Sequence, residues 1–113
     1  MEKLIGLNKL KTAVFISGTG SNLKNLIKFS KIKRAPVSIN LVISNVYKAK
    51  GLKYADQFNI KKKIFDYKNI KDTEKKILAL LKKEKINFIC LAGFMKILSR
   101  NFIKKFDGKI INI

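Results

Sequence analysis

Short apolar runs alternate with segments of helical periodicity along this chain, and that alternation limits the folds open to it. Residues 12–17 and 87–92 are continuous apolar runs, which are typical of strands buried on both faces. Further strands are predicted over residues 37–44, 63–65 and 109–113. Because strands that alternate with helices form parallel sheets, we predict an α/β fold, a Rossmann-like parallel sheet with flanking helices.

The segments between these runs have the spacing of amphipathic helices. The first places Leu23 and Ile27 on one face, and Ser21 or Asn22 is suited to cap its N-terminus. The other predicted helices cover 49–58, a segment capped by Asp72 or Thr73, and 99–105.

The length of 113 residues predicts one domain, because domains commonly have about 100–200 residues. We predict this domain over residues 1–113, with residues 1–11 as an additional or disordered N-terminal segment. The chain stops in or just after an apolar strand, and no helix follows to cover it. We therefore expect a truncated fold, the N-terminal part of a longer protein.

The charge balance is strongly basic, with 26 Lys and Arg against 7 Asp and Glu. Such a balance fits nonspecific binding of nucleic acid through phosphate contacts, which is one hypothesis. Only Arg34 and Arg100 are arginine, however, although arginine is the residue best suited to read base edges. The lysines are spread along the whole chain, so we interpret them as solvated surface residues and do not expect a nucleic-acid partner.

The single cysteine and the absence of histidine exclude several kinds of site. One cysteine cannot form a disulfide framework, and without histidine no zinc site of the usual ligands is possible, so we predict no metal. Cys90 is predicted to be a buried structural thiol. No apolar run approaches the roughly 18 residues of a membrane helix, so we expect a soluble cytoplasmic protein without a membrane partner.

The loop Gly18-Thr19-Gly20-Ser21-Asn22, between the first strand and the first helix, has the pattern of a phosphate site. Glycine lets the backbone approach a ligand, and a helix N-terminus offers free N–H groups. A dinucleotide fits poorly, because the third expected glycine falls at Leu23 and no acid follows the second strand. A structural turn without a ligand is the alternative interpretation.

A second candidate is the segment 91–98, just past the carboxyl end of the fourth predicted strand. Ligands of open α/β sheets bind at that edge, so this apolar segment could line a pocket for a flat ligand. It could equally pack onto the sheet.

Four motifs in order, residues 14–23, 42–45, 91–99 and 110–113, resemble the phosphoribosylglycinamide formyltransferases, which are folate-dependent enzymes of purine synthesis. The resemblance implies that Gly20, Ser21 and Asn22 bind the phosphate of the ribonucleotide. It also implies that Asn112 is the catalytic asparagine, whose amide stabilises the oxyanion on the formyl carbon.

The resemblance further implies a site for 10-formyltetrahydrofolate, lined by Met95, Lys96, Ile97 and Leu98. An arginine that contacts the folate in the family would fall near Ile70, where this chain has none. The family's catalytic histidine and its aspartate would lie beyond residue 113.

We therefore expect formyl transfer from 10-formyltetrahydrofolate to glycinamide ribonucleotide for the parent protein, and an inactive chain when these 113 residues stand alone. A non-catalytic phosphate- or nucleotide-binding module is the alternative. A monomer or a homodimer fits either function.

Overall fold

The computed structural model describes residues 9–113, whose centre is a five-stranded sheet of parallel strands in the order β3-β2-β1-β4-β5. Its strands are β1 (Leu10–Ile16), β2 (Val37–Ser44), β3 (Lys61–Ile64), β4 (Phe88–Leu91) and β5 (Lys109–Asn112). The predicted α/β fold with a parallel sheet is confirmed. Residues 1–8 of the predicted N-terminal segment lie outside the described residues.

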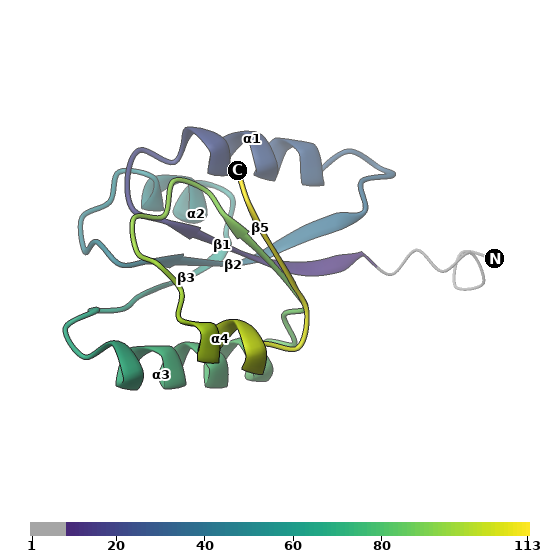
Figure 1. The fold of residues 1–113 in the computed structure, drawn as a ribbon. Helices are drawn as coiled ribbons and strands as arrows, with labels where there is room; N and C mark the ends of the chain where they lie inside the picture. Colours follow the sequence, from purple (N-terminus) through teal and green to yellow (C-terminus); the bar gives the residue numbers. More distant parts are fainter. Residues whose placement is uncertain (1–8) are drawn as a thin grey trace.

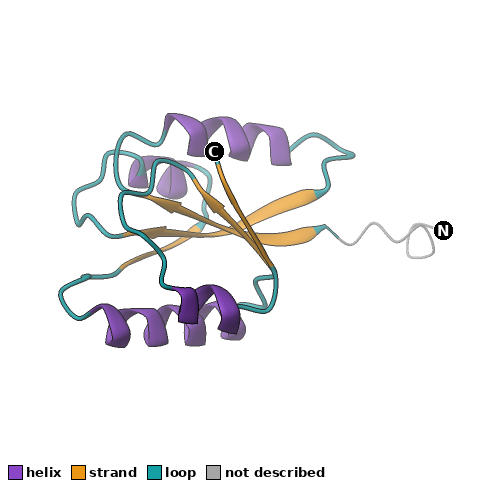
Figure 2. Cartoon of the chain, in the orientation of Figure 1, coloured by secondary structure: helices purple, strands orange, loops and turns teal. Residues whose placement is uncertain are grey.

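Helices cover both faces of the sheet, as Figures 1 and 2 show. They are α1 (Ser21–Ser30), α2 (Leu52–Gln57), α3 (Ile70–Lys83) and α4 (Arg100–Lys105). The helices α1 and α2 lie on one face, and α3 and α4 lie on the other (Figure 1). No helix in residues 9–113 combines the length and the apolar character that crossing a membrane requires.

Successive residues of β1 point to opposite faces and supply two separate cores. Phe15 packs with Ile77 and Phe102 under α3 and α4, while Val14 packs with Leu23 under α1. All five of these side chains are fully buried, and Leu52 of α2 adds to the core under α1 with an exposed fraction of 7%. Burial on both faces explains why β1 is apolar at every position from Ala13 to Ile16.

The edge strands are less apolar than the centre. The structure places β3 over Lys61–Ile64 rather than 63–65, paired with Leu41–Ser44 of β2. Its three lysines are exposed, as is common at a sheet edge, where charge discourages pairing with another chain. The strand β1 begins at Leu10, two residues before the predicted start, because it continues to pair with β2.

Two predicted helix boundaries are wrong. The helix α3 is capped by Asn69, whose side-chain oxygen accepts the Asp72 N–H at 3.2 Å, and not by Asp72 or Thr73. The helix α2 begins at Leu52 rather than at residue 49, because the chain before it forms tight turns, in which the Leu52 N–H donates to the Ala49 carbonyl at 3.1 Å.

Candidate functional site

The chain reverses its direction of travel across the sheet between β1 and β4. From β1 it proceeds through β2 to β3, then crosses back to β4 and β5 on the other side. The loops that follow β1 and β4 therefore leave neighbouring strands toward opposite faces. In open α/β sheets this reversal is where ligands bind, at the carboxyl ends of the strands.

The loop after β1 turns into α1 at Gly20, which has a φ of 78° and is the N-cap of the helix. The prediction that Ser21 or Asn22 caps α1 is therefore wrong, because both residues lie inside the first turn. Their side chains are exposed, and no side chain caps this helix end within the described residues. The first turn of α1 thus presents free N–H groups and the positive end of the helix dipole.

The loop 18–22 is fastened to the start of α2. The Gly51 N–H donates to the Gly18 carbonyl at 2.9 Å, and the Lys24 N–H donates to the Gly20 carbonyl at 2.8 Å. A Cβ on Gly20 would lie 3.3 Å from the Tyr54 ring, so this ring supports the loop directly. These contacts fix the shape of the loop from within the chain, as is expected of a preformed binding site.

Two backbone N–H groups of the loop after β4, residues 92–99, donate hydrogen bonds to β1 and to the residue that follows it. The Ala92 N–H donates to the Phe15 carbonyl at 2.9 Å. The Met95 N–H donates to the Ser17 hydroxyl oxygen at 2.8 Å. These two bonds bring the predicted folate segment next to the predicted phosphate loop.

An aromatic cluster fills the space beneath this loop. The rings of Phe15 and Phe94 meet edge to face with centroids 5.3 Å apart, and those of Tyr67 and Phe94 lie 5.8 Å apart. Burial, with a smaller contribution from the nearby Glu74 carboxylate, raises the pKa of Tyr67 to about 12. The Tyr67 hydroxyl is buried and has no hydrogen-bond partner among the described residues.

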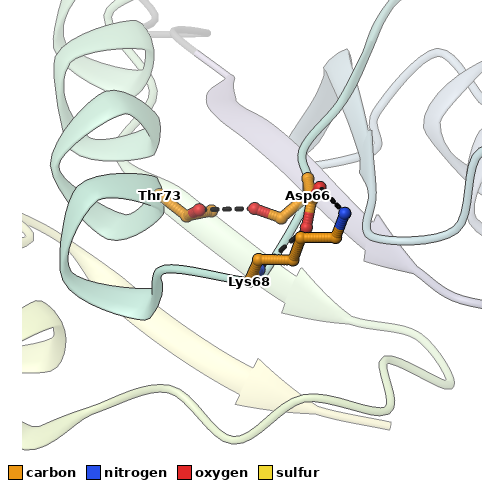
Figure 3. A network of polar contacts seen from close by, with 3 residues as sticks. All are labelled: Asp66, Lys68 and Thr73. Atoms are coloured by element: carbon orange, nitrogen blue, oxygen red, sulfur yellow. Dashed lines mark hydrogen bonds and ion pairs between the residues drawn. The ribbon is translucent and has the colours of Figure 1, made fainter.

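Asp66 and Lys68, the sequence neighbours of Tyr67, form polar contacts with each other and with Thr73 (Figure 3). The Thr73 hydroxyl donates to the Asp66 carbonyl, and the Lys68 N–H donates to the Asp66 carboxylate at 2.8 Å. The bond from Thr73 ties the segment after β3 to α3, and the Tyr67 ring in this segment packs against Phe94.

The far end of the loop 92–99 is attached to α3 through Glu74. One carboxylate oxygen of Glu74 accepts the Ser99 N–H at 2.9 Å, and the other accepts the Ser99 hydroxyl. The Ser99 hydroxyl oxygen also accepts the Phe102 N–H at 3.0 Å and so caps α4. Glu74 is only 6% exposed, and these hydrogen bonds offset the cost of burying its carboxylate.

The predicted folate residues do not all face the same way. Met95 and Ile97 are 78% and 90% exposed, and Lys96 is exposed as well. Leu98, in contrast, is 8% exposed and packs in the core with Phe102. Three of the four side chains are thus available to a ligand, while Leu98 anchors the segment.

Asn112 and Cys90 lie on the strands beside this loop. Asn112 is exposed at the end of β5 and is in register with Leu91, the last residue of β4. Cys90 is 2% exposed, and burial raises the pKa of its thiol, as expected of a structural cysteine. Asn112 therefore reaches the same edge of the sheet as the two loops.

Sequence reasoning missed Ser17, Tyr67 and Glu74, which hold the site in place. Each contacts a partner distant in the sequence; Ser17 and Met95 are 78 positions apart. The one available signal was a polar residue, Ser17, at the end of an apolar strand.

A groove of about 820 Å³ lies between α3 and α4, and Ile70, Glu74 and Ser99 are among its lining residues. It contains none of the predicted site residues. No three His, Cys, Asp or Glu side chains of residues 9–113 gather into a possible metal site.

A parallel sheet with a glycine loop at the reversal of strand order defines a doubly wound α/β protein with a ligand-binding edge. The family model described as formyl transferase matches residues 10–113. The chain belongs to the formyl transferase family.

Named relatives and solved structures agree with this assignment. The chain is 40% identical over 106 residues to phosphoribosylglycinamide formyltransferase of Haemophilus influenzae, covering 91% of this chain and 50% of the relative. It is 41% identical over 112 residues to the trifunctional purine biosynthetic protein adenosine-3 of Gallus gallus, covering 96% of this chain and 11% of that protein.

The crystal structure of the Brucella melitensis phosphoribosylglycinamide formyltransferase superposes with a TM-score of 0.88 at 35% identity, over 93% of this chain and 56% of that one. The chain thus spans about half the length of the bacterial relatives that it matches.

Proposed function

We propose that this chain contributes the phosphate loop and part of the folate wall of a phosphoribosylglycinamide formyltransferase of purine synthesis. The reaction is the transfer of a formyl group from 10-formyltetrahydrofolate to the amine of glycinamide ribonucleotide. A cytoplasmic location belongs to the same proposal. The relatives named above support this assignment, since two of them are called phosphoribosylglycinamide formyltransferase.

The observation that carries the proposal is the meeting of three predicted groups at one edge of the sheet. The loop with Gly20 follows β1, the exposed Met95 and Ile97 follow β4, and Asn112 ends β5. Because β1, β4 and β5 are consecutive in the sheet, these groups are side by side. A phosphate and a flat apolar donor could therefore bind within reach of one another.

The residues match the chemistry of each ligand. The free N–H groups at Ser21 and Asn22 suit a phosphate, and the dipole of α1 favours its negative charge. The exposed Met95 and Ile97 offer apolar contact to a pterin ring, and the Lys96 ammonium suits a carboxylate of the folate.

In the reaction, the substrate amine attacks the formyl carbon and an oxyanion develops on the formyl oxygen. The Asn112 side-chain N–H donates to that oxyanion and stabilises it. The bond from the formyl carbon to the folate N10 then breaks, the amine loses a proton and N10 gains one. The 113 residues contain no His for this proton transfer, so we propose that they bind ligand without ordinary turnover.

Calorimetric titration of the 113-residue chain with glycinamide ribonucleotide tests the proposal. Binding is expected, and Asn22→Ala is expected to weaken it about tenfold, because one polar contact to a charged phosphate is lost. Asn25→Ala is the matched control, because Asn25 is also an exposed asparagine of α1 but lies outside the loop 18–22. It should bind as the wild type does.

Three results would count against the proposal. Absence of binding to the wild-type chain would refute the phosphate assignment. Equal loss in Asn22→Ala and Asn25→Ala would place the ligand elsewhere, and ordinary formyl transfer by the isolated chain would refute the assignment of an incomplete site. Binding of simple phosphates and nucleotides without preference for the glycinamide group would favour the phosphate-binding module.

A further inference from the structure

One hydroxyl joins the three loops that leave the central strands at the ligand edge. Ser17 is the residue directly after β1, and its side-chain oxygen accepts the Met95 N–H at 2.8 Å. The same hydroxyl donates to the Asn45 side-chain oxygen, directly after β2. Ser17 is 8% exposed, so little water is available to compete for these bonds.

The Asn45 end of this chain of bonds is itself fixed. The Ser44 hydroxyl oxygen accepts a hydrogen bond from the Val46 N–H at 2.9 Å. The same hydroxyl donates to the Val46 carbonyl at 2.8 Å. This local turn sets the direction in which the chain leaves β2 at Asn45. The Ser17 hydroxyl therefore has a defined acceptor, which leaves its lone pair directed at the Met95 N–H.

The Met95 end projects into solvent. The Met95 side chain is 78% exposed although its N–H is bonded inside the molecule, and the neighbouring Ile97 is 90% exposed. Gly93, two residues before Met95, has a φ of 71°, and no atom lies within 4 Å of a Cβ built on it. Between Ala92 and Leu98, the hydrogen bond from the Met95 N–H to Ser17 is thus the backbone bond that orients the exposed Met95 and Ile97 side chains.

The phosphate loop has a different attachment. Gly18 is bonded to Gly51 at the start of α2, and that bond does not involve the Ser17 side chain. Loss of the Ser17 hydroxyl would consequently loosen the backbone at Met95, between the packed Phe94 and Leu98, and leave the loop with Gly20 in place.

We propose that Ser17 is a positioning residue that, together with Asn45, sets the folate segment 95–97 against the phosphate loop. The inference deepens the proposed function and rests on it for the identity of the two ligands. Its structural part, that Ser17 controls the order of the segment at Met95, is independent of any ligand.

Amide hydrogen exchange of the 113-residue chain, compared between Ser17→Ala and the wild type, tests the structural part. The Met95 amide is expected to exchange about tenfold faster in the variant, because its one hydrogen bond is lost. The Gly51 and Ala92 amides, which are bonded to backbone carbonyls, should not change.

Ser30→Ala is the matched control. Ser30 has the same 8% exposure, and its hydroxyl donates to the Ile27 carbonyl at the far end of α1. It should leave Met95 exchange unchanged. Equal acceleration of the Met95, Gly51 and Ala92 amides in Ser17→Ala, or none at Met95, would overturn the proposal.

Ligand titration separates this inference from the proposed function. Ser17→Ala should weaken binding of 5-formyltetrahydrofolate, used as a stable folate probe, by about tenfold and change ribose 5-phosphate binding less than twofold. Equal weakening of both would show a general structural role and overturn the proposal. If the wild-type chain binds neither probe, the proposed function fails, and the exchange experiment still decides the role of Ser17.

Discussion

The backbones of Gly20 and Gly51 touch: a Cβ built on Gly20 would lie 2.5 Å from the Gly51 Cα. Gly20 also has a φ of 78°, a conformation that side chains disfavour. Gly20 lies in the middle of the predicted phosphate loop 18–22 and Gly51 precedes α2, so the loop can adopt its shape only where two glycines meet.

Gly20→Ala is therefore expected to destabilise the chain by about 2–4 kcal/mol, the sum of left-handed strain and overpacking. Urea unfolding followed by circular dichroism measures the change. Gly18→Ala should have little effect, because its Cβ would meet nothing within 4 Å. Equal stability of the two variants would contradict the close approach.

Glu74→Ala is expected to cost about 1–3 kcal/mol, because the Ser99 N–H and hydroxyl lose buried acceptors. Glu74→Gln keeps one acceptor oxygen and should lose less. Glu84→Ala, which breaks the surface pair with Lys61, is the control and should leave the unfolding midpoint nearly unchanged. The prediction fails if Glu84→Ala is as destabilising as Glu74→Ala.

The raised pKa of Tyr67 predicts a loss of stability in alkali. The folded protein keeps the phenol proton up to about pH 12, whereas the unfolded chain releases it near the ordinary value of 10. The contribution of Tyr67 to stability is thus complete below pH 10 and is lost as the pH rises from 10 to 12.

Tyr67→Phe removes this titration, so its stability relative to the wild type should rise between pH 9 and pH 11, by up to about 1–2 kcal/mol. At neutral pH the substitution should cost little, since the hydroxyl has no partner among the described residues. Tyr47→Phe is the control, because Tyr47 is 77% exposed. A parallel response of both variants would remove the assignment to Tyr67.

Cys90 should react slowly with an aromatic disulfide reagent at pH 8 while the chain is folded. The thiol is 2% exposed and burial raises its pKa, so little thiolate is available to the reagent. In urea, one thiol per chain should react at the rate of a free cysteine. Equal rates with and without urea would show that β4 opens readily.

Sequence periodicity identified most of the elements because its signals are local. The apolar runs at Ala13–Ile16 and Phe88–Leu91 became central strands, and 37–44 was predicted with the bounds that the structure has. Both faces of such strands are covered by helices, so each side chain along the run is apolar. Gly20 was singled out by the glycine loop after the first strand and Asn112 by the family resemblance, and both lie at one edge of the sheet.

Helix ends were less predictable. Ser21, Asp72 and Thr73 are good capping residues by type, but Gly20 and Asn69 occupy the N-cap positions. The choice depends on where the chain enters the helix; for α1 the contact between Gly20 and Gly51 decides it.

The sequence by itself determined the α/β class, the glycine loop after β1 and the family motifs, since each depends on residues close together in the chain. Only the tertiary structure decided that Ser17 binds Met95, that Glu74 is buried against Ser99, and that Leu98 joins the core while Ile97 stays exposed. These relationships depend on the order of the strands and on the faces that the helices cover. Because no periodicity records which distant residues meet, they follow from the packing of the whole sheet.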